Sequence, residues 1–149
     1  MRNKLILLSV LIISLAILAF VILKLPSQNT QTQIQPKSKT SVLYESKTDE
    51  KGSVVVEVKP LSLIPKDNVS FNLTFTTHSG DLSYDIAAIA KLQDDKGNTS
   101  KALSWTGGKG GHHLSGILTF PKLSEDAWAV TLTISGIDNQ DRIFEWELN

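Results

Sequence analysis

The chain has 149 residues, of which 41% are hydrophobic and 20% are charged, with a formal net charge of zero and no cysteine. This length predicts one domain with appendages. The lack of cysteine excludes a disulfide framework, thiolate metal sites and a cysteine nucleophile. All 15 acidic residues follow residue 25, whereas three of the 15 basic residues, Arg2, Lys4 and Lys24, precede it. Residues 26–149 therefore carry a net charge of −3, which argues against nucleic acid as a partner.

The N-terminal segment Leu5–Leu23 is apolar except for two serines. As a helix it would span about 28 Å, close to the hydrocarbon thickness of a bilayer. The segment is longer than the apolar region of a signal peptide and no small-residue cleavage site follows it, so we expect residues 1–25 to form an uncleaved membrane anchor. A cleaved signal peptide is the alternative. Arg2 and Lys4 predict a cytoplasmic N-terminus and a domain on the outer side of the cell membrane.

Two regions of different composition follow the apolar segment. Residues 26–40 are rich in Gln, Thr, Ser and Pro, and Ile34 is their one large aliphatic residue, which predicts a flexible linker. Residues 41–149 contain short runs in which apolar and polar residues alternate, the period typical of half-buried strands. The runs expected to form strands are residues 54–58, 71–76, 86–92, 100–106, 117–120, 128–134 and 143–148.

About seven short strands with no convincing helix predict an all-β domain, an immunoglobulin-like antiparallel β-sandwich; a small barrel is the alternative. The turn sequence Asp94–Asn98 predicts a hairpin between two of the strands. Trp128 and Trp146 are expected in the core. Trp105 lies beside a glycine-rich loop and is a candidate contact for a ligand.

All three histidines fall in two segments that are expected to be connections. His78 belongs to the segment THSGDLSYD, which also contains Asp81 and Asp85, and His112 and His113 end the segment WTGGKGGHH. Connections at one end of a sandwich converge, and binding sites are commonly placed there. We therefore expect the two segments to lie beside each other.

The chemistry that these residues suggest is a divalent metal site. Imidazole binds zinc and copper(II), and carboxylates complete such sites, so the candidate ligands are His78, Asp81, Asp85, His112 and His113. Gly111 is, with Trp105, a candidate contact for a ligand, and the glycines of this loop would allow it to turn a histidine inward. The alternative is structural: the same side chains would hold the loops together through hydrogen bonds.

The order of these motifs resembles a family of uncharacterised membrane-anchored or exported prokaryotic proteins. The likeness covers residues 54–148 and is carried by THSGDLSYD, DDKGN, LSW-x-GG, GGHHLSGILTFP and a final R-x-F-x-W. It implies an immunoglobulin-like domain outside the cytoplasm and no particular activity. The positions that match the motifs are His78, Asp81, Asp85, Trp105, Gly111, His112, His113 and Gly116.

Three functions remain open at this point. The chain is expected to be a tethered binding module for an unknown ligand, with a divalent metal as a candidate cofactor. A metal-dependent hydrolase would need an open coordination position and a general base within reach. An accessory subunit of a membrane complex would use the anchor helix, which lacks the G-x-x-x-G pattern of tightly paired helices. The small domain and its short loops favour binding over catalysis.

Overall fold

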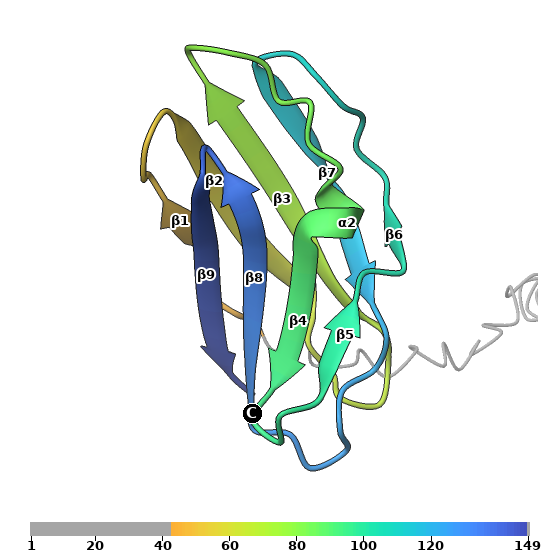
Figure 1. The fold of residues 1–149 in the computed structure, drawn as a ribbon. Coiled ribbons are helices and arrows are strands. Elements are labelled where there is room, and N and C mark those ends of the chain that lie inside the picture. The colour runs from red at the N-terminus through yellow and green to blue at the C-terminus, as the bar shows by residue number, and fades with distance from the viewer. Residues whose placement is uncertain (1–42, 149) are drawn as a thin grey trace, which may run out of the picture. The chain divides into compact units, whose positions relative to one another are not determined.

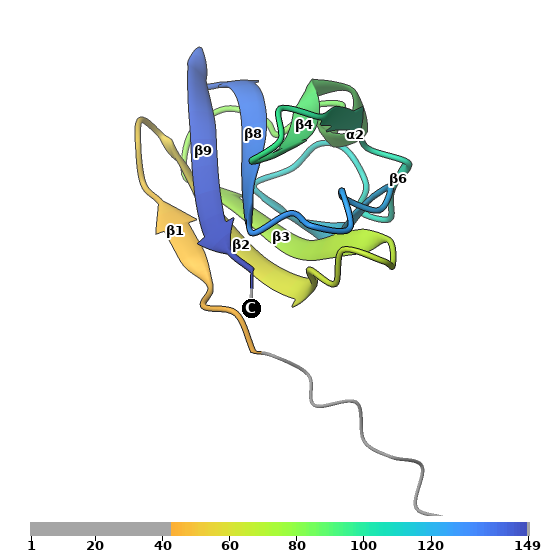
Figure 2. The same cartoon turned by 90° about the horizontal axis from the view of Figure 1, so that it is seen from below.

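Two antiparallel β-sheets pack face to face in the computed structural model, which describes residues 43–148 (Figure 1). The first sheet has the order β1-β2-β3-β7-β6 and consists of β1 (Lys47–Asp49), β2 (Val54–Ser62), β3 (Val69–Thr77), β6 (Ser104–Trp105) and β7 (His113–Phe120). The second has the order β5-β4-β8-β9 and consists of β4 (Ala90–Asp94), β5 (Thr99–Lys101), β8 (Ala129–Ile137) and β9 (Gln140–Glu147). Figure 2 shows the two layers end-on. The expected all-β sandwich is confirmed.

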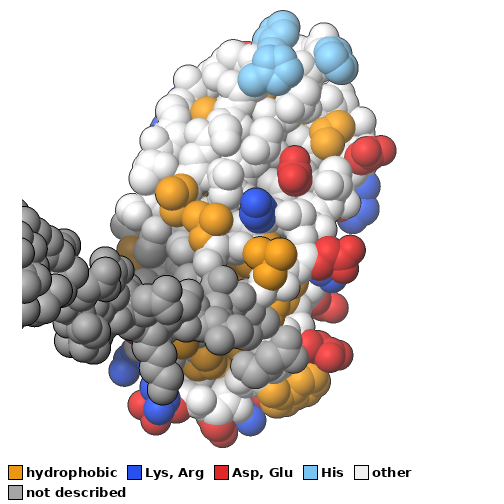
Figure 3. Space-filling model, turned by 180° about the vertical axis from the view of Figure 1, so that it is seen from behind, with side chains coloured by type: hydrophobic (Ala, Val, Ile, Leu, Met, Phe, Trp, Pro, Cys, Tyr) orange, Lys and Arg blue, Asp and Glu red, His pale blue; other side chains and the backbone are white. Residues whose placement is uncertain are grey.

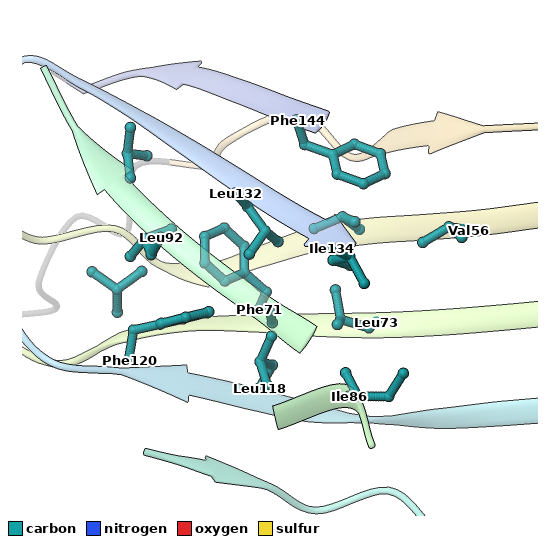
Figure 4. Close-up of a cluster of buried hydrophobic side chains, with 14 of the residues drawn as sticks. Val56, Phe71, Leu73, Ile86, Leu92, Leu118, Phe120, Leu132, Ile134 and Phe144 are labelled. Atoms are coloured by element: carbon teal, nitrogen blue, oxygen red, sulfur yellow. The ribbon is translucent and has the colours of Figure 1, made fainter. Parts of the chain in front are cut away.

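The alternation seen in the sequence creates the core between the sheets. In β2 and β3 every second side chain is buried, because successive side chains of a strand point to opposite faces. Phe71 lies near the centre of this core, where its ring packs edge-on against Phe120 at 6.2 Å and at a tilt against Trp146 of the opposite sheet at 5.3 Å. Figure 4 shows the aliphatic and aromatic side chains that fill the remaining space.

The number of strands differs from the sequence prediction, because the described residues contain nine strands rather than about seven. The expected strand 100–106 is divided between the sheets. β5 pairs with β4, as the predicted hairpin requires, whereas β6 pairs with β7 in the other sheet. The chain thus changes sheets between Lys101 and Ser104. The short strand β1, which pairs with β2, was not predicted.

The expected strand 86–92 is wrong in its first half. Residues Ile86–Ile89 form a short helical turn, α2, and β4 begins at Ala90. The side chain of Asp85 caps this turn, since its carboxylate accepts a hydrogen bond from the amide of Ala88 at 3.3 Å. An apolar run of this length fits either a buried turn or a strand, so its period alone did not distinguish them.

The hairpin between β8 and β9 has a two-residue turn at Asp138 and Asn139. Both residues have positive φ, 53° and 58°, which is the backbone of a type I′ turn. The carboxylate of Asp138 accepts hydrogen bonds from the amide and the hydroxyl of Ser53, at 2.7 and 3.1 Å. This turn is thereby joined to the start of β2 in the other sheet.

The predicted anchor, residues 1–25, and the predicted linker, residues 26–40, lie outside the described residues. Within residues 43–148 there is no helix of sufficient length and hydrophobicity to cross a membrane.

Candidate functional site

The two histidine-containing segments lie beside each other, as expected. β3 and β7 are antiparallel neighbours, and Thr76 at the end of β3 pairs with His113 at the start of β7. The segment that follows β3 and the segment that precedes β7 therefore meet at one end of the sandwich, at the top in Figure 1. We call residues 78–85 together with residues 107–113 the histidine end. His113 was expected in a connection but is the first residue of β7.

Backbone hydrogen bonds join the two segments of the histidine end. The amide of Thr77 donates to the carbonyl of His112 at 2.9 Å, and Leu82 exchanges bonds with the glycine loop, donating to Gly111 at 3.0 Å and accepting from Gly110 at 2.9 Å. Gly110 and Gly111 have φ of 86° and 83°, in the left-handed region where glycine is favoured. Gly111, predicted as a ligand contact, thus has a clear role in shaping the loop.

Asp81 holds the loops together through its side chain. Its carboxylate accepts hydrogen bonds from the hydroxyl of Ser83 and from the amide of Gly111. These two bonds lower the pKa of Asp81 below its ordinary value, and the charge of His112 lowers it further. The structural role proposed as the alternative for this carboxylate is therefore present in the fold. Ser83, which the sequence reasoning did not single out, is part of it.

Asp85 has two partners at the surface. In addition to capping α2, it forms an ion pair with Lys109, whose Nζ lies 3.2 Å from a carboxylate oxygen. The hydrogen bond from Lys109 is the main reason why the pKa of Asp85 lies below its ordinary value. Lys109 was not among the predicted site residues, although it is the only charged residue of the glycine-rich loop. This ion pair is a second side-chain link between the segments.

The three histidines are all exposed, and Figure 3 shows their side chains gathered at the same end of the domain. Nδ1 of His113 lies 3.4 Å from the hydroxyl of Thr76 across the strand pair. His112 lies close enough to Asp81 to influence its pKa, and the side chain of His78 forms no hydrogen bond or ion pair within residues 43–148. The same residues contain no group of three or more His, Asp or Glu side chains placed to hold a metal ion.

Trp105 is packed against the glycine loop. Its indole nitrogen donates to the carbonyl of Gly108 at 3.1 Å, and its ring meets Phe75 edge-on at 6.4 Å. The ring lies where side chains on Gly107 and Gly116 would otherwise be: a Cβ on Gly107 would lie 2.2 Å from the indole, and a Cβ on Gly116 would lie 2.3 Å from the Gly107 amide nitrogen. Trp105, predicted as a ligand contact, is half-buried and anchors the loop.

The other two tryptophans differ sharply in exposure. Trp146 is in the core with 5% of its surface exposed, as expected. Trp128 is 58% exposed, so the prediction that it is a core residue is wrong. It precedes β8, at the end of the sandwich opposite the histidines. Nothing in the alternation pattern marks where a strand leaves the core.

Comparison with known proteins identifies no family. No family model matches the chain, and no curated protein matches it. The solved structures with partial similarity include the following two. One is a DUF4426 family protein from Pseudomonas aeruginosa, with 10% identity and a TM-score of 0.41 over 68% of this chain and 94% of that chain. The other is the secreted protein MPT63 from Mycobacterium tuberculosis, with 17% identity and a TM-score of 0.40 over 70% of this chain and 91% of that chain.

Proposed function

We propose that this chain is a membrane-tethered extracytoplasmic binding module whose binding surface is the histidine end. The observation that carries the proposal is the placement of all three imidazoles at exposed positions of the histidine end, whose two segments are joined by hydrogen bonds. Loops that are ordered before binding lose less conformational entropy when a ligand arrives. Connections at the end of a sandwich are also a common location for binding sites.

The proposal includes an immunoglobulin-like arrangement of the strands. In immunoglobulin constant-type domains the sheets have the orders A-B-E-D and C-F-G. The order β2-β3-β7-β6 in one sheet and β4-β8-β9 in the other is consistent with this scheme when β2 is taken as strand A. β1 and β5 then extend one edge of each sheet.

The tethering rests on the sequence of residues 1–40, and one feature of the domain is consistent with it. The carbonyl of Glu45 accepts a hydrogen bond from the indole of Trp146 at 2.8 Å, and Trp146 pairs with Val130 near the start of β8. The first described residues therefore lie at the end of the sandwich opposite the histidines. Because the chain enters the domain at one end and the proposed binding surface is at the other, the tether would leave that surface accessible.

The ligand class that we propose is a divalent transition-metal ion, zinc or copper(II), bound through imidazole nitrogens. Exposed side chains change rotamer in picoseconds to nanoseconds, so a metal ion would recruit the imidazoles by side-chain rotation. Fixing each side chain would cost about 0.5–1.5 kcal/mol. His78, which has no partner within residues 43–148, and His112, beside Asp81, are the first candidates. Water would complete the coordination.

The test is the melting temperature of the full-length chain in detergent micelles with zinc or copper(II) in excess. A metal that binds the folded state raises the melting temperature by mass action. We expect the rise to disappear when the pH falls below the imidazole range near 6.5, because a protonated imidazole does not bind metal. The variant His78→Ala/His112→Ala should lose the rise, and the control Glu57→Gln, on an exposed position of β2, should keep it.

Two results would contradict the proposal. The first is a melting temperature that neither metal changes. The second is a rise that persists when all three histidines are replaced by alanine, which would place the metal elsewhere on the chain.

A further inference from the structure

A second surface lies at the end of the sandwich opposite the histidines. It is an open groove of about 780 Å³, bounded by the Asp94–Asp95 turn, the start of β8 and the end of β9, with Glu45 and Lys47 along one side. We propose that this groove docks an extended, basic peptide segment of another protein. The proposal concerns a different surface from the histidine end and does not depend on a ligand there.

The carboxylates of the groove fall into two classes. Asp94 and Asp95 already have hydrogen-bond partners within the domain. Asp94 is buried and accepts hydrogen bonds from Ser124 and Asn98, and Asp95 accepts hydrogen bonds from the backbone amides of residues 128 and 129. In contrast, Glu45, Glu145 and Glu147 are exposed and form no ion pair within residues 43–148. Lys47 is the one basic residue among the described residues that line the groove. The groove therefore presents an excess of negative charge that the described residues do not neutralise.

Glu145 and Glu147 have the spacing of an extended peptide. They are two residues apart on the outward face of β9, so their side chains leave the same face about 7 Å apart along the strand. In an extended peptide, side chains two residues apart are separated by the same distance of about 7 Å. A segment with Lys or Arg at every second position would place one cation opposite each glutamate.

Indole rings provide the second feature that suits a cationic partner. Trp128 lines the groove with more than half of its surface exposed, and exposed tryptophans are favoured anchors at interfaces. The ammonium group of Lys47 already lies 5.7 Å from the centre of the Trp146 ring. The groove thus holds one ammonium group over an indole within the chain itself, the geometry of a cation–π contact.

The experiment measures binding of fluorescent peptides to the full-length chain in neutral detergent by anisotropy. The probes are an alternating Lys-Ser peptide and an alternating Glu-Ser peptide of equal length. We expect the lysine peptide to bind at least tenfold more tightly than the glutamate peptide, and to weaken as salt is added, because salt screens exposed charges. The variant Glu145→Gln/Glu147→Gln should bind the lysine peptide at least tenfold more weakly, and Trp128→Ala should weaken it several-fold.

The matched control is Glu57→Gln, which removes an exposed carboxylate from the outer face of the other sheet. It should bind the lysine peptide as the unmodified chain does. Equal binding by the double variant and this control would overturn the proposal, and so would equal binding of the two peptides. Spermine is the third probe. If it displaced the lysine peptide at the same total concentration of positive charge, the groove would be a general cation site and the peptide assignment would be wrong.

Discussion

The guanidinium group of Arg142 in β9 donates a hydrogen bond to the carboxylate of Asp49 in β1, and so joins the two sheets. Arg142 is fully buried, and the same guanidinium also donates to the carbonyls of Lys51 and Val54. Burial by itself would raise the pKa of Asp49, but hydrogen bonds from Lys51 and Arg142 hold it below its ordinary value. The ion pair thereby holds β1, the first strand of the domain, against β9 of the other sheet.

Replacing Asp49 by Asn should destabilise the domain by about 3 kcal/mol, because it leaves the buried charge of Arg142 without its counterion. The measurement is urea unfolding of a fragment containing residues 41–149. Glu50→Gln is the control, since Glu50 is the exposed neighbour. A loss in the Asn variant no larger than that of the control would show that Asp49 contributes no more than a surface carboxylate.

The fragment of residues 41–149 should fold without the preceding residues, because the two sheets that the structure describes and the core between them lie within residues 43–148. Its circular dichroism should show β-structure with little helix, since α2 spans only Ile86–Ile89. A spectrum with more than about a quarter helix would contradict the fold.

Stability should fall as the pH drops below about 4. The pKa values of Asp49 and Asp94 are lowered in the folded chain, so each folded-state pKa is below the unfolded-state value. Such groups stabilise the protein above the unfolded-state pKa, and that stability is lost as the pH falls through the folded-state pKa. Melting temperatures between pH 7 and pH 2 test this. The Asp49→Asn variant should lose less between pH 4 and pH 2 than the unmodified chain, and parallel curves would exclude Asp49 as a contributor.

Gly116→Ala should destabilise the domain by about 2 kcal/mol, because the new methyl group would meet the backbone of Gly107 and the Trp105 ring. Gly108→Ala is the control, in the glycine-rich loop that faces Gly116, where a Cβ would have no heavy atom within 4 Å. Urea unfolding compares the two. Equal stabilities would mean that the loop moves away from β7 at little cost.

The two tryptophans at the end of the second sheet should respond differently to replacement by alanine. Trp146→Ala should cost about 3–5 kcal/mol because it removes a buried ring that packs on Phe71. Trp128→Ala should change stability by less than about 1 kcal/mol, since most of that ring is in water. A large loss for Trp128 would show that its ring supports the fold, and would weaken its assignment as a docking residue.

The sequence determined the strands that alternate. In residues 54–58, 71–76 and 130–134, the period of two places one set of side chains in the core and the other on the outer face of the sheet, and this depends only on local backbone geometry. The meeting of the two histidine segments was also predictable, because it follows from where strands end. The helical turn at Ile86–Ile89 was not, because a short apolar run has no period that separates a turn from a strand.

The pairing partners of the strands and of the polar side chains depend on the tertiary structure. Residues 100–106 divide between two sheets because β4 and β7, distant in sequence, provide their pairing edges. The Asp81 carboxylate joins the two loops because the fold brings the amide of Gly111 within hydrogen-bond distance of it. Arg142 can be buried because its guanidinium group donates to the Asp49 carboxylate and to two backbone carbonyls. Such contacts join residues between 30 and 93 positions apart, so their energies depend on the folded arrangement and leave no pattern along the chain.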